Sequence, residues 1–164
     1  MDMNRNARAA ALAAVREWHE GQRYGSEDYV DGHLLPVAVA AERKALRWTQ
    51  DVDELADAYL VGLLHDTIED GAASAIDIIR LLKPIIGSMR AVDVADAVDT
   101  LARKSDETYA EYIARLPEAS PNVKEIVLEV KIADLAFNLA GGAKGLDSLR
   151  KRYEKAWSAL DVHL

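Results

Sequence analysis

Four titratable side chains crowd the end of an apolar segment. The run AYLVGLL, residues 58–64, leads directly into His65, Asp66, Glu69 and Asp70. If the chain stays helical, residues four apart stack in two parallel columns, one headed by His65 and the other by Asp66. Neighbouring carboxylates repel, and a bound cation relieves that repulsion most readily. The group therefore favours a cation site, and the alternative is an acidic helix end with a core histidine.

A second signal is a carboxylate on the apolar face of the helix expected at residues 122–139. The apolar stripe consists of Val123, Ile126, Val127, Val130 and Phe137. Asp134 falls on this stripe, and Asn138 follows one turn later. A lone carboxylate there loses several kcal/mol of hydration unless a positive or donating group meets it. Asp134 is therefore a ligand, or it pairs with Lys131, or the helix ends early and the residue is solvated.

A third candidate is His33, which follows a polar loop and starts an apolar segment. With His65, Asp66 and Asp134 it forms a set of two imidazoles and two carboxylates from three separate segments. These donors suit a divalent metal ion that keeps positions open for water, as catalytic sites do. Such an ion lowers the pKa of a bound water from 15.7 towards about 7, and a nearby carboxylate then accepts or relays the proton.

Helices must position these side chains. Ala, Leu, Glu, Arg and Lys are abundant, and no stretch alternates polar and apolar residues for long enough to indicate a sheet. The sequence therefore predicts an all-α bundle. Its helices are expected at residues 4–20, 33–48, 52–65, 74–82, 88–101, 107–116, 122–139 and 146–160, with a polar loop at 21–32 and Pro84 beyond the end of the fourth helix. His19 and His163 are expected at the surface.

Length and composition fit a single domain covering residues 1–164. A chain of this size buries roughly 68 to 70% of the surface that its unfolded form exposes. Because the chain has no cysteine, disulfides, iron–sulfur clusters and thiol nucleophiles are excluded. Charged residues interrupt the N-terminal segment, and no window has the apolar length of a signal peptide or a membrane span. We therefore expect a soluble, cytoplasmic protein without a membrane partner.

The net charge of −8 argues against a nucleic-acid partner, because proteins that bind nucleic acids normally carry a basic excess. The acidic excess lies in residues 51–99, which hold eleven acidic and three basic residues. Such a block is either a solvated helix face or a set of acids that includes some pointing into a site.

The motifs resemble those of the HD-domain phosphohydrolases, and within them the hydrolase domains of RelA/SpoT homologues and the small alarmone hydrolases. WHEGQR (18–23) and YVDGHLLPVA (29–38) are similar to the opening segments of that family. HDTIED (65–70) resembles the HDxxED box of the alarmone branch. VKIADLAFNL (130–139) resembles its lysine-x-alanine-aspartate segment, which ends in asparagine.

The chain departs from the family pattern at two places. Three residues separate Tyr29 from His33, where the family usually has two. Ala136 and Phe137 stand before Asn138, where the family often has a basic residue or a histidine.

The resemblance implies an HD-type helical bundle that hydrolyses a nucleotide. The implied metal ligands are His33, His65, Asp66 and Asp134, and manganese is the implied metal. Glu69 and Asp70 would orient and deprotonate the attacking water. Asn138 would contact the sugar or a phosphate of the nucleotide, and Arg23 would lie beside the base or its phosphates. The implied reaction removes pyrophosphate from the 3′ position of guanosine tetra- or pentaphosphate (ppGpp or pppGpp).

A site with this many carboxylates repels a polyanion, so cations must surround it. The substrate candidates are Arg23, Lys104, Asn138 and Tyr153. Tyr153 stands between basic residues, where an aromatic ring can stack on a base or donate to a phosphate. Other basic residues, such as Arg103, fit a solvated helix face equally well.

Two alternatives remain open. The same metal chemistry could act on another nucleotide or on NADPH, because a metal and a water do not choose the leaving group. The chain could also be a module that binds a nucleotide without turning it over, although the pair Glu69 and Asp70 argues against this. The sequence leaves the oligomeric state open.

Overall fold

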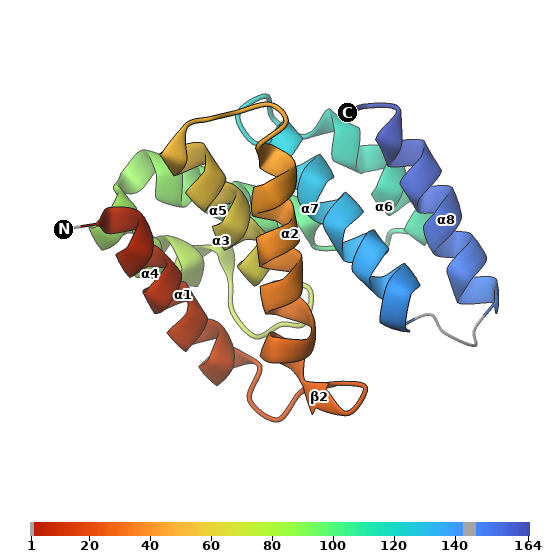
Figure 1. The fold of residues 1–164 in the computed structure, drawn as a ribbon, viewed down its shortest axis with the longest axis horizontal. Helices are drawn as coiled ribbons and strands as arrows, with labels where there is room; N and C mark the ends of the chain where they lie inside the picture. Colours follow the sequence, from red (N-terminus) through yellow and green to blue (C-terminus); the bar gives the residue numbers. More distant parts are fainter. Residues whose placement is uncertain (1, 143–146) are drawn as a thin grey trace.

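The structure is a computed structural model that describes residues 2–142 and 147–164, and it is mostly helical (Figure 1). The helices are α1 (Met3–Trp18), α2 (Leu35–Ala45), α3 (Val52–Leu64), α4 (Ala75–Ile86), α5 (Ser88–Leu101), α6 (Tyr109–Arg115), α7 (Lys124–Phe137) and α8 (Asp147–Asp161). A 3₁₀ turn, Leu116–Glu118, follows α6. This confirms the predicted all-α class. The last predicted helix starts at residue 146, which lies outside the described residues. None of the described helices is long and apolar enough to span a bilayer.

Side chains that bind free backbone amides fix where several helices begin. Asp51 caps α3 by accepting hydrogen bonds from two first-turn amides at 2.7 and 3.2 Å. Ser74 and Asp77 form a reciprocal capping box at the start of α4, and Thr108 and Glu111 form another at α6. Such caps each contribute about 1 kcal/mol, because they pair donors that the helix leaves unpaired.

The predicted end of the fourth helix is wrong, since α4 continues through Pro84 to Ile86. Proline removes one backbone donor and crowds the carbonyl four residues earlier. Pro84 is exposed and lies in the last turn, so water can solvate the carbonyl that loses its partner. The helix ends instead before Gly87, whose φ of 84° is one that glycine adopts easily.

Helix α2 lies at the centre of the bundle, between α3 and α7 (Figure 1). Helix α1 packs on α3 and α4, α4 packs on α5, and α8 covers α7 and α6. The core is built of aliphatic side chains, and Leu34, Leu63 and Leu135 are among the largest that are fully buried. The junction of α2, α3 and α7 is therefore the most enclosed part of the fold.

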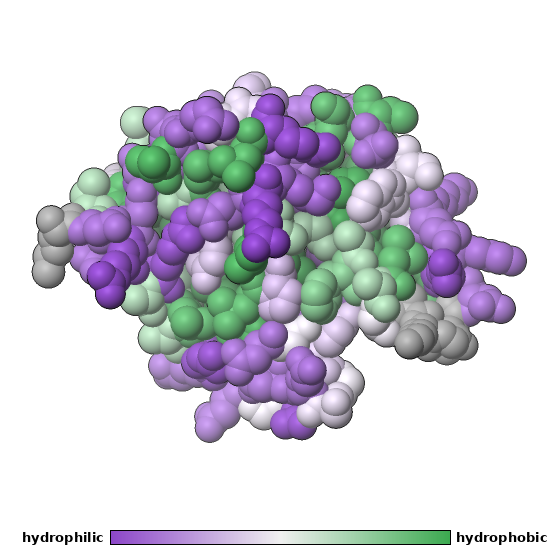
Figure 2. Space-filling model, in the orientation of Figure 1, coloured by the Kyte–Doolittle hydropathy of each residue, from purple (hydrophilic) through white to green (hydrophobic). Residues whose placement is uncertain are grey.

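The face shown in Figure 2 is mostly hydrophilic, with hydrophobic side chains between the polar ones. Some large apolar residues are nevertheless exposed, among them Val52, Ile76 and Met89. Helices such as α1 and α4 bury one side and leave the other to water, as the periodicity of the sequence predicts. Helix α7 and the second half of α3 are instead buried on almost all sides.

The predicted polar loop at 21–32 contains regular structure that the sequence analysis missed. Strands β1 (Arg23–Tyr24) and β2 (Glu27–Asp28) form a two-stranded antiparallel hairpin, and Gly25 in its turn has a φ of 61°. A π-helical turn, Val30–Leu34, then leads into α2. Strands of two residues are too short to produce an alternating pattern, so periodicity could not reveal them.

Helices α2 and α3 approach each other closely at Gly62. A Cβ atom added to this glycine would lie 2.8 Å from Cα of Ala38 and 3.2 Å from Cβ of Ala41. Contacts this short require backbone movement, because interiors are close-packed. Glycine at this position therefore permits the crossing, which lies three residues before His65.

We expect Gly62→Ala to destabilise the protein by about 1 to 3 kcal/mol, because the added methyl group overpacks the crossing. Helix propensity alone predicts the opposite, a gain of about 1 kcal/mol. Urea unfolding of the variant measures the sign, with the exposed Glu54→Ala on the same helix as a control. A stabilised variant would contradict the close approach of α2 and α3.

Candidate metal centre

The four predicted ligands come together at the junction of α2, α3 and α7. His33 lies in the π-helical turn, His65 and Asp66 follow α3, and Asp134 lies in the last turn of α7. Nε2 of His33 lies 3.3 Å from Oδ2 of Asp66 and 3.4 Å from Oδ1 of Asp134. Nε2 of His65 lies 3.0 Å and 3.7 Å from the same two oxygens. Two nitrogen and two oxygen donors from distant segments therefore face one another.

The environment of His65 fits a metal ligand. Its Nδ1 donates a hydrogen bond to the carbonyl of Gly62 at 2.8 Å, because a carbonyl can only accept. In the neutral ring this leaves the lone pair on Nε2, which is buried and has no hydrogen-bond partner among the described residues. A backbone carbonyl on the other ring nitrogen is the usual way in which proteins orient a metal-binding histidine.

Electrostatics at the cluster also favour a cation. Burial by itself lowers the pKa of His65, but the carboxylates of Asp66 and Asp134 outweigh it and raise the pKa to about 10. Burial likewise raises the pKa of Asp66, and the two histidines overcome it and hold the pKa well below its usual range. The carboxylates thus stay ionised and attract positive charge. Among the described residues, His33, His65 and Asp66 form the one group with ligand atoms within 4.8 Å of one another.

Asp134 uses its two oxygens differently. Nζ of Lys131 donates to Oδ2 at 2.7 Å, which is the ion pair that the sequence left open as an alternative. Nδ2 of Asn138 donates to Oδ1, also at 2.7 Å, and Oδ1 is the oxygen that faces the histidines. One oxygen of Asp134 therefore forms the ion pair, while the other faces the histidines and stays available to a metal ion. Lys131 and the histidines hold the pKa of Asp134 well below its usual range, although burial opposes them.

Two tyrosines, one in the hairpin and one directly after it, contact the clustered side chains. The hydroxyl of Tyr29 donates to Oδ2 of Asp66 at 2.5 Å. The ring of Tyr24 stacks on His33, with centroids 4.9 Å apart and planes 19° apart, and its hydroxyl donates to Oδ1 of Asn138 at 3.1 Å. Sequence reasoning assigned Tyr24 no role, because only the hairpin brings it over the cluster.

The π-helical turn accounts for the extra residue between Tyr29 and His33. A π turn accommodates one more residue than an α turn, and such turns are frequent at functional sites. Tyr29 therefore still reaches Asp66, while His33 still faces Asp134. Gly32 fits inside this turn because a Cβ there would lie 3.0 Å from Cβ of Glu27.

The structure separates the two carboxylates predicted to act on water. Glu69 lines the pocket beside the cluster, and its Oε2 accepts a hydrogen bond from the backbone N–H of Arg103 at 3.1 Å. Asp70 is not among the residues that line this pocket. It accepts a hydrogen bond from Nε2 of Gln22 at 3.2 Å and lies 3.7 Å from Nδ1 of His19.

The prediction that His19 lies at the surface is wrong, since the residue is 1% exposed. Its Nδ1 contacts Oε1 of Gln22, and its Nε2 lies 3.3 Å from Oγ1 of Thr67. Its ring centroid is 5.5 Å from that of Tyr29. His19 therefore supports the residues behind the cluster. The signal available in the sequence was its place within the WHEGQR segment.

The pocket over the cluster has a volume of about 300 Å³. Its lining residues are Tyr24, Tyr29, His33, Asp66, Glu69, Arg103, Tyr109, Tyr112, Lys131, Asp134, Asn138, Arg152 and Tyr153. Two of the four substrate candidates, Asn138 and Tyr153, are among them. Arg23 is not, and its guanidinium donates to the carbonyl of Ser26 in the hairpin. Lys104 is not either, so the roles of Arg23 and Lys104 stay predictions.

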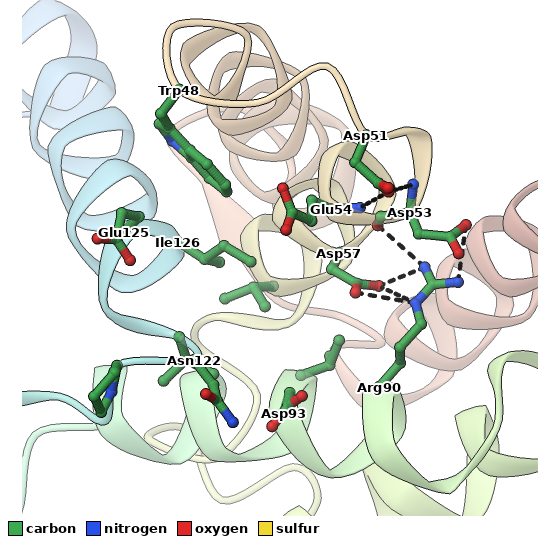
Figure 3. Close-up of a pocket in the computed structure, with 14 residues that line it drawn as sticks. Trp48, Asp51, Asp53, Glu54, Asp57, Arg90, Asp93, Asn122, Glu125 and Ile126 are labelled. Carbon is green, nitrogen blue, oxygen red and sulfur yellow. Dashed lines mark hydrogen bonds and ion pairs between the residues drawn. The ribbon is translucent and has the colours of Figure 1, made fainter.

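A second and larger pocket, of about 480 Å³, lies elsewhere and holds many of the acids of residues 51–99 (Figure 3). Arg90 bonds to both oxygens of Asp57 at 2.7 to 3.2 Å and pairs with Asp53 at 3.1 Å. Through these contacts between α3 and α5, the positive charge of Arg90 offsets negative charge on Asp53 and Asp57. The arrangement is that of a structural ion pair. Most acids of residues 51–99 thus line one of the two pockets, and more of them line the second pocket than the pocket over the cluster.

Comparison with known proteins identifies a relative over nearly the whole chain. No family model matches the chain. The chain is 30% identical over 164 residues to GTP pyrophosphokinase rsh of Brucella melitensis biotype 1. The match covers 99% of this chain and 20% of that protein, so the chain spans about a fifth of the length of the relative. The similarity therefore extends over every segment that contributes to the cluster.

We expect Asp134→Asn to weaken Mn²⁺ binding, because it removes a charged ligand and keeps the shape of the side chain. The loss should exceed the roughly 10- to 100-fold that results when a residue hydrogen-bonded to a metal ligand is removed. Calorimetry measures the affinity. Thermal unfolding checks it, since a ligand at 100 times its Kd stabilises the folded state by about 2.7 kcal/mol. Asp93→Asn makes the same charge change in the second pocket and should bind like the wild type. Equal affinity of both variants would remove Asp134 from the centre.

We expect His19→Ala to lower the free energy of unfolding by about 1 to 3 kcal/mol, because it removes a buried ring and leaves the buried hydroxyl of Thr67 without this partner. Denaturant unfolding measures the loss. His163→Ala, at the exposed C-terminal end, should change stability by less than about 0.5 kcal/mol. Equal stability of the two variants would show that His19 makes no net contribution there.

Proposed function

We propose that this chain is a single-domain, metal-dependent phosphohydrolase that removes the 3′ pyrophosphate from guanosine tetra- or pentaphosphate. The observation that carries the proposal is the convergence of His33, His65, Asp66 and Asp134 in one cluster at the base of the pocket. All of them except His65 line the pocket. The HD-type motifs of the sequence support the hydrolytic direction. The relative supports the nucleotide, because a GTP pyrophosphokinase makes a pyrophosphorylated guanosine nucleotide, and the proposed reaction removes that pyrophosphate.

The charge of the pocket supports a polyanionic substrate. Among the described lining residues, three carboxylates face three cations: Asp66, Glu69 and Asp134 against Arg103, Lys131 and Arg152. With neutral histidines the pocket is uncharged, and a divalent ion gives it an excess of two positive charges. Such a pocket attracts phosphate groups, although the whole chain carries −8.

The four ligand residues would hold a divalent metal ion, with Mn²⁺ the preferred candidate. The ion would supply Lewis-acid activation of a water and of the phosphoryl group. Glu69 would act as the general base, because its carboxylate lies in the pocket wall and the amide of Arg103 holds one of its oxygens. The other oxygen can then accept a proton. Asp70 would position Gln22 and His19 behind the pocket.

The proposed reaction is a hydrolysis that consumes one water and releases pyrophosphate. The oxygen of water bonds to the phosphorus next to the ribose, while the bond from this phosphorus to the 3′ oxygen breaks. Glu69 takes a proton from the water, and the 3′ oxygen takes up a proton as it leaves. Asn138 would orient Asp134, because its amide already bonds to Asp134 and Tyr24. Tyr153 would contact the substrate from the other wall of the pocket.

A single assay tests the proposal. The protein is stripped of metal with a chelator and supplied with Mn²⁺, and the release of pyrophosphate and of orthophosphate from guanosine tetraphosphate is followed beside GTP, ATP and NADPH. We expect metal-dependent release from the tetraphosphate alone. Preferential turnover of NADPH or of another nucleotide supports the alternative substrate. Binding without turnover supports the non-catalytic module, and formation of guanosine tetraphosphate from GTP and ATP supports the synthetic direction.

We expect Glu69→Gln to lower kcat by about 10²- to 10⁴-fold, the usual contribution of a general base, and to leave Mn²⁺ affinity unchanged. Steady-state kinetics and calorimetry measure the two quantities. Glu118→Gln, an exposed residue remote from the pocket, makes the same change and should keep full activity. Full turnover by Glu69→Gln would exclude this carboxylate as the base.

A further inference from the structure

Two arginines of the metal pocket differ from most others in the chain. The arginines that pair with a carboxylate are Arg8, Arg16, Arg47, Arg80, Arg90, Arg115 and Arg150. Arg103 and Arg152 line the pocket, and neither has a carboxylate within ion-pair distance in the described part of the chain. In a protein with 28 acidic residues, two guanidinium groups thus remain available at the place where a substrate would bind.

The guanidinium of Arg152 is held by aromatic rings. It lies 4.6 Å from the ring centroid of Tyr109 and 5.5 Å from that of Tyr153. Stacking uses the flat face of a guanidinium and leaves the N–H groups in its plane free to donate. The rings therefore hold Arg152 in place while leaving its donors available, and such a planar fork matches the oxygens of a phosphate.

Arg152 lies apart from the metal ligands. Asp134 binds Lys131, whose Nζ lies 5.1 Å from the ring centroid of Tyr112. The next ring, Tyr109, is 6.0 Å from Tyr112, and Arg152 stacks on it. In the described part of the chain, no ion pair or hydrogen bond joins Arg152 to Lys131, Asp134, Asp66 or the two histidines. Arg152 thus lies beside the cluster rather than among its members, where it can bind a phosphate that the cluster does not hold.

We infer that Arg152, assisted by Arg103, binds a second phosphate-bearing group of the substrate, remote from the bond that is hydrolysed. In guanosine tetraphosphate this group is the 5′ diphosphate. The inference rests on the proposed function, which places the 3′ pyrophosphate at the metal ligands. The pocket wall formed by α8 and by the segment after α5 thereby selects nucleotides that carry phosphates at both the 3′ and the 5′ position of the ribose.

The test compares two substrates, guanosine tetraphosphate and guanosine 3′-diphosphate, which lacks the 5′ phosphates. Arg152→Gln keeps much of the side-chain stem and removes the charge. We expect kcat/KM for the tetraphosphate to fall about 10- to 100-fold, mainly through KM, as for a lost charge-assisted hydrogen bond. With the 3′-diphosphate it should change by less than about twofold. Arg103→Gln should behave in the same way, and the backbone amide that holds Glu69 remains.

Arg150→Gln is the matched control, because Arg150 lies on the same helix, pairs with Glu154 at 2.9 Å and does not line the pocket. It should leave both substrates unaffected. An equal loss on both substrates with Arg152→Gln, or no loss on either, overturns the inference. Circular dichroism and Mn²⁺ affinity confirm that the variants are folded.

Direct binding separates this inference from the proposed reaction. GDP carries the 5′ diphosphate and guanosine does not, so calorimetry with the Mn²⁺-loaded protein measures the subsite without turnover. We expect GDP to bind about 10- to 100-fold more tightly than guanosine to the wild type, and the preference to disappear in Arg152→Gln. If the protein prefers GDP over guanosine but does not hydrolyse guanosine tetraphosphate, the proposed reaction is refuted and the subsite is not. Equal affinity of the wild type for GDP and guanosine would refute the subsite.

Discussion

The site depends on a buried carboxylate that the fold compensates only in part. Asp134 is 5% exposed, and one of its oxygens is neutralised by Lys131 at 2.7 Å. The other oxygen accepts from Asn138 and still faces two imidazoles and the carboxylate of Asp66. Two carboxylates at this spacing repel in a medium of low polarity, so the arrangement calls for further positive charge. Protons on the histidines or a metal ion can provide it.

The four clustered side chains lie at the ends of helices, where the backbone can be oriented without disturbing the core. His65 follows α3 immediately, and its ring is oriented by the carbonyl of Gly62, the residue at which α2 and α3 approach most closely. His33 comes from a π-helical turn, and the ring of Tyr24 covers it. Gly62 thus takes part both in the packing of α2 against α3 and in the orientation of His65.

The fold brings together acidic and basic side chains that lie far apart in the sequence. Most of the acids of residues 51–99 line either the pocket over the cluster or a second pocket, in which Arg90 compensates Asp57 (Figure 3). The cations of the pocket over the cluster, Arg103, Lys131 and Arg152, all follow this acidic segment in the sequence. Net charge therefore describes the solubility of the chain and says little about the ligand that the pocket attracts.

The sequence by itself determined the helical class and which four polar side chains would be gathered, because amphipathic periodicity is local and a carboxylate such as Asp134 on an apolar stripe demands a partner. Only the tertiary structure decided what surrounds them. In the folded chain His19 is buried, Asp70 bonds to Gln22 and does not line the pocket, and Arg152 lines the pocket whereas Arg23 does not. These outcomes depend on a hairpin too short to leave a pattern and on contacts between distant segments, which no local periodicity encodes.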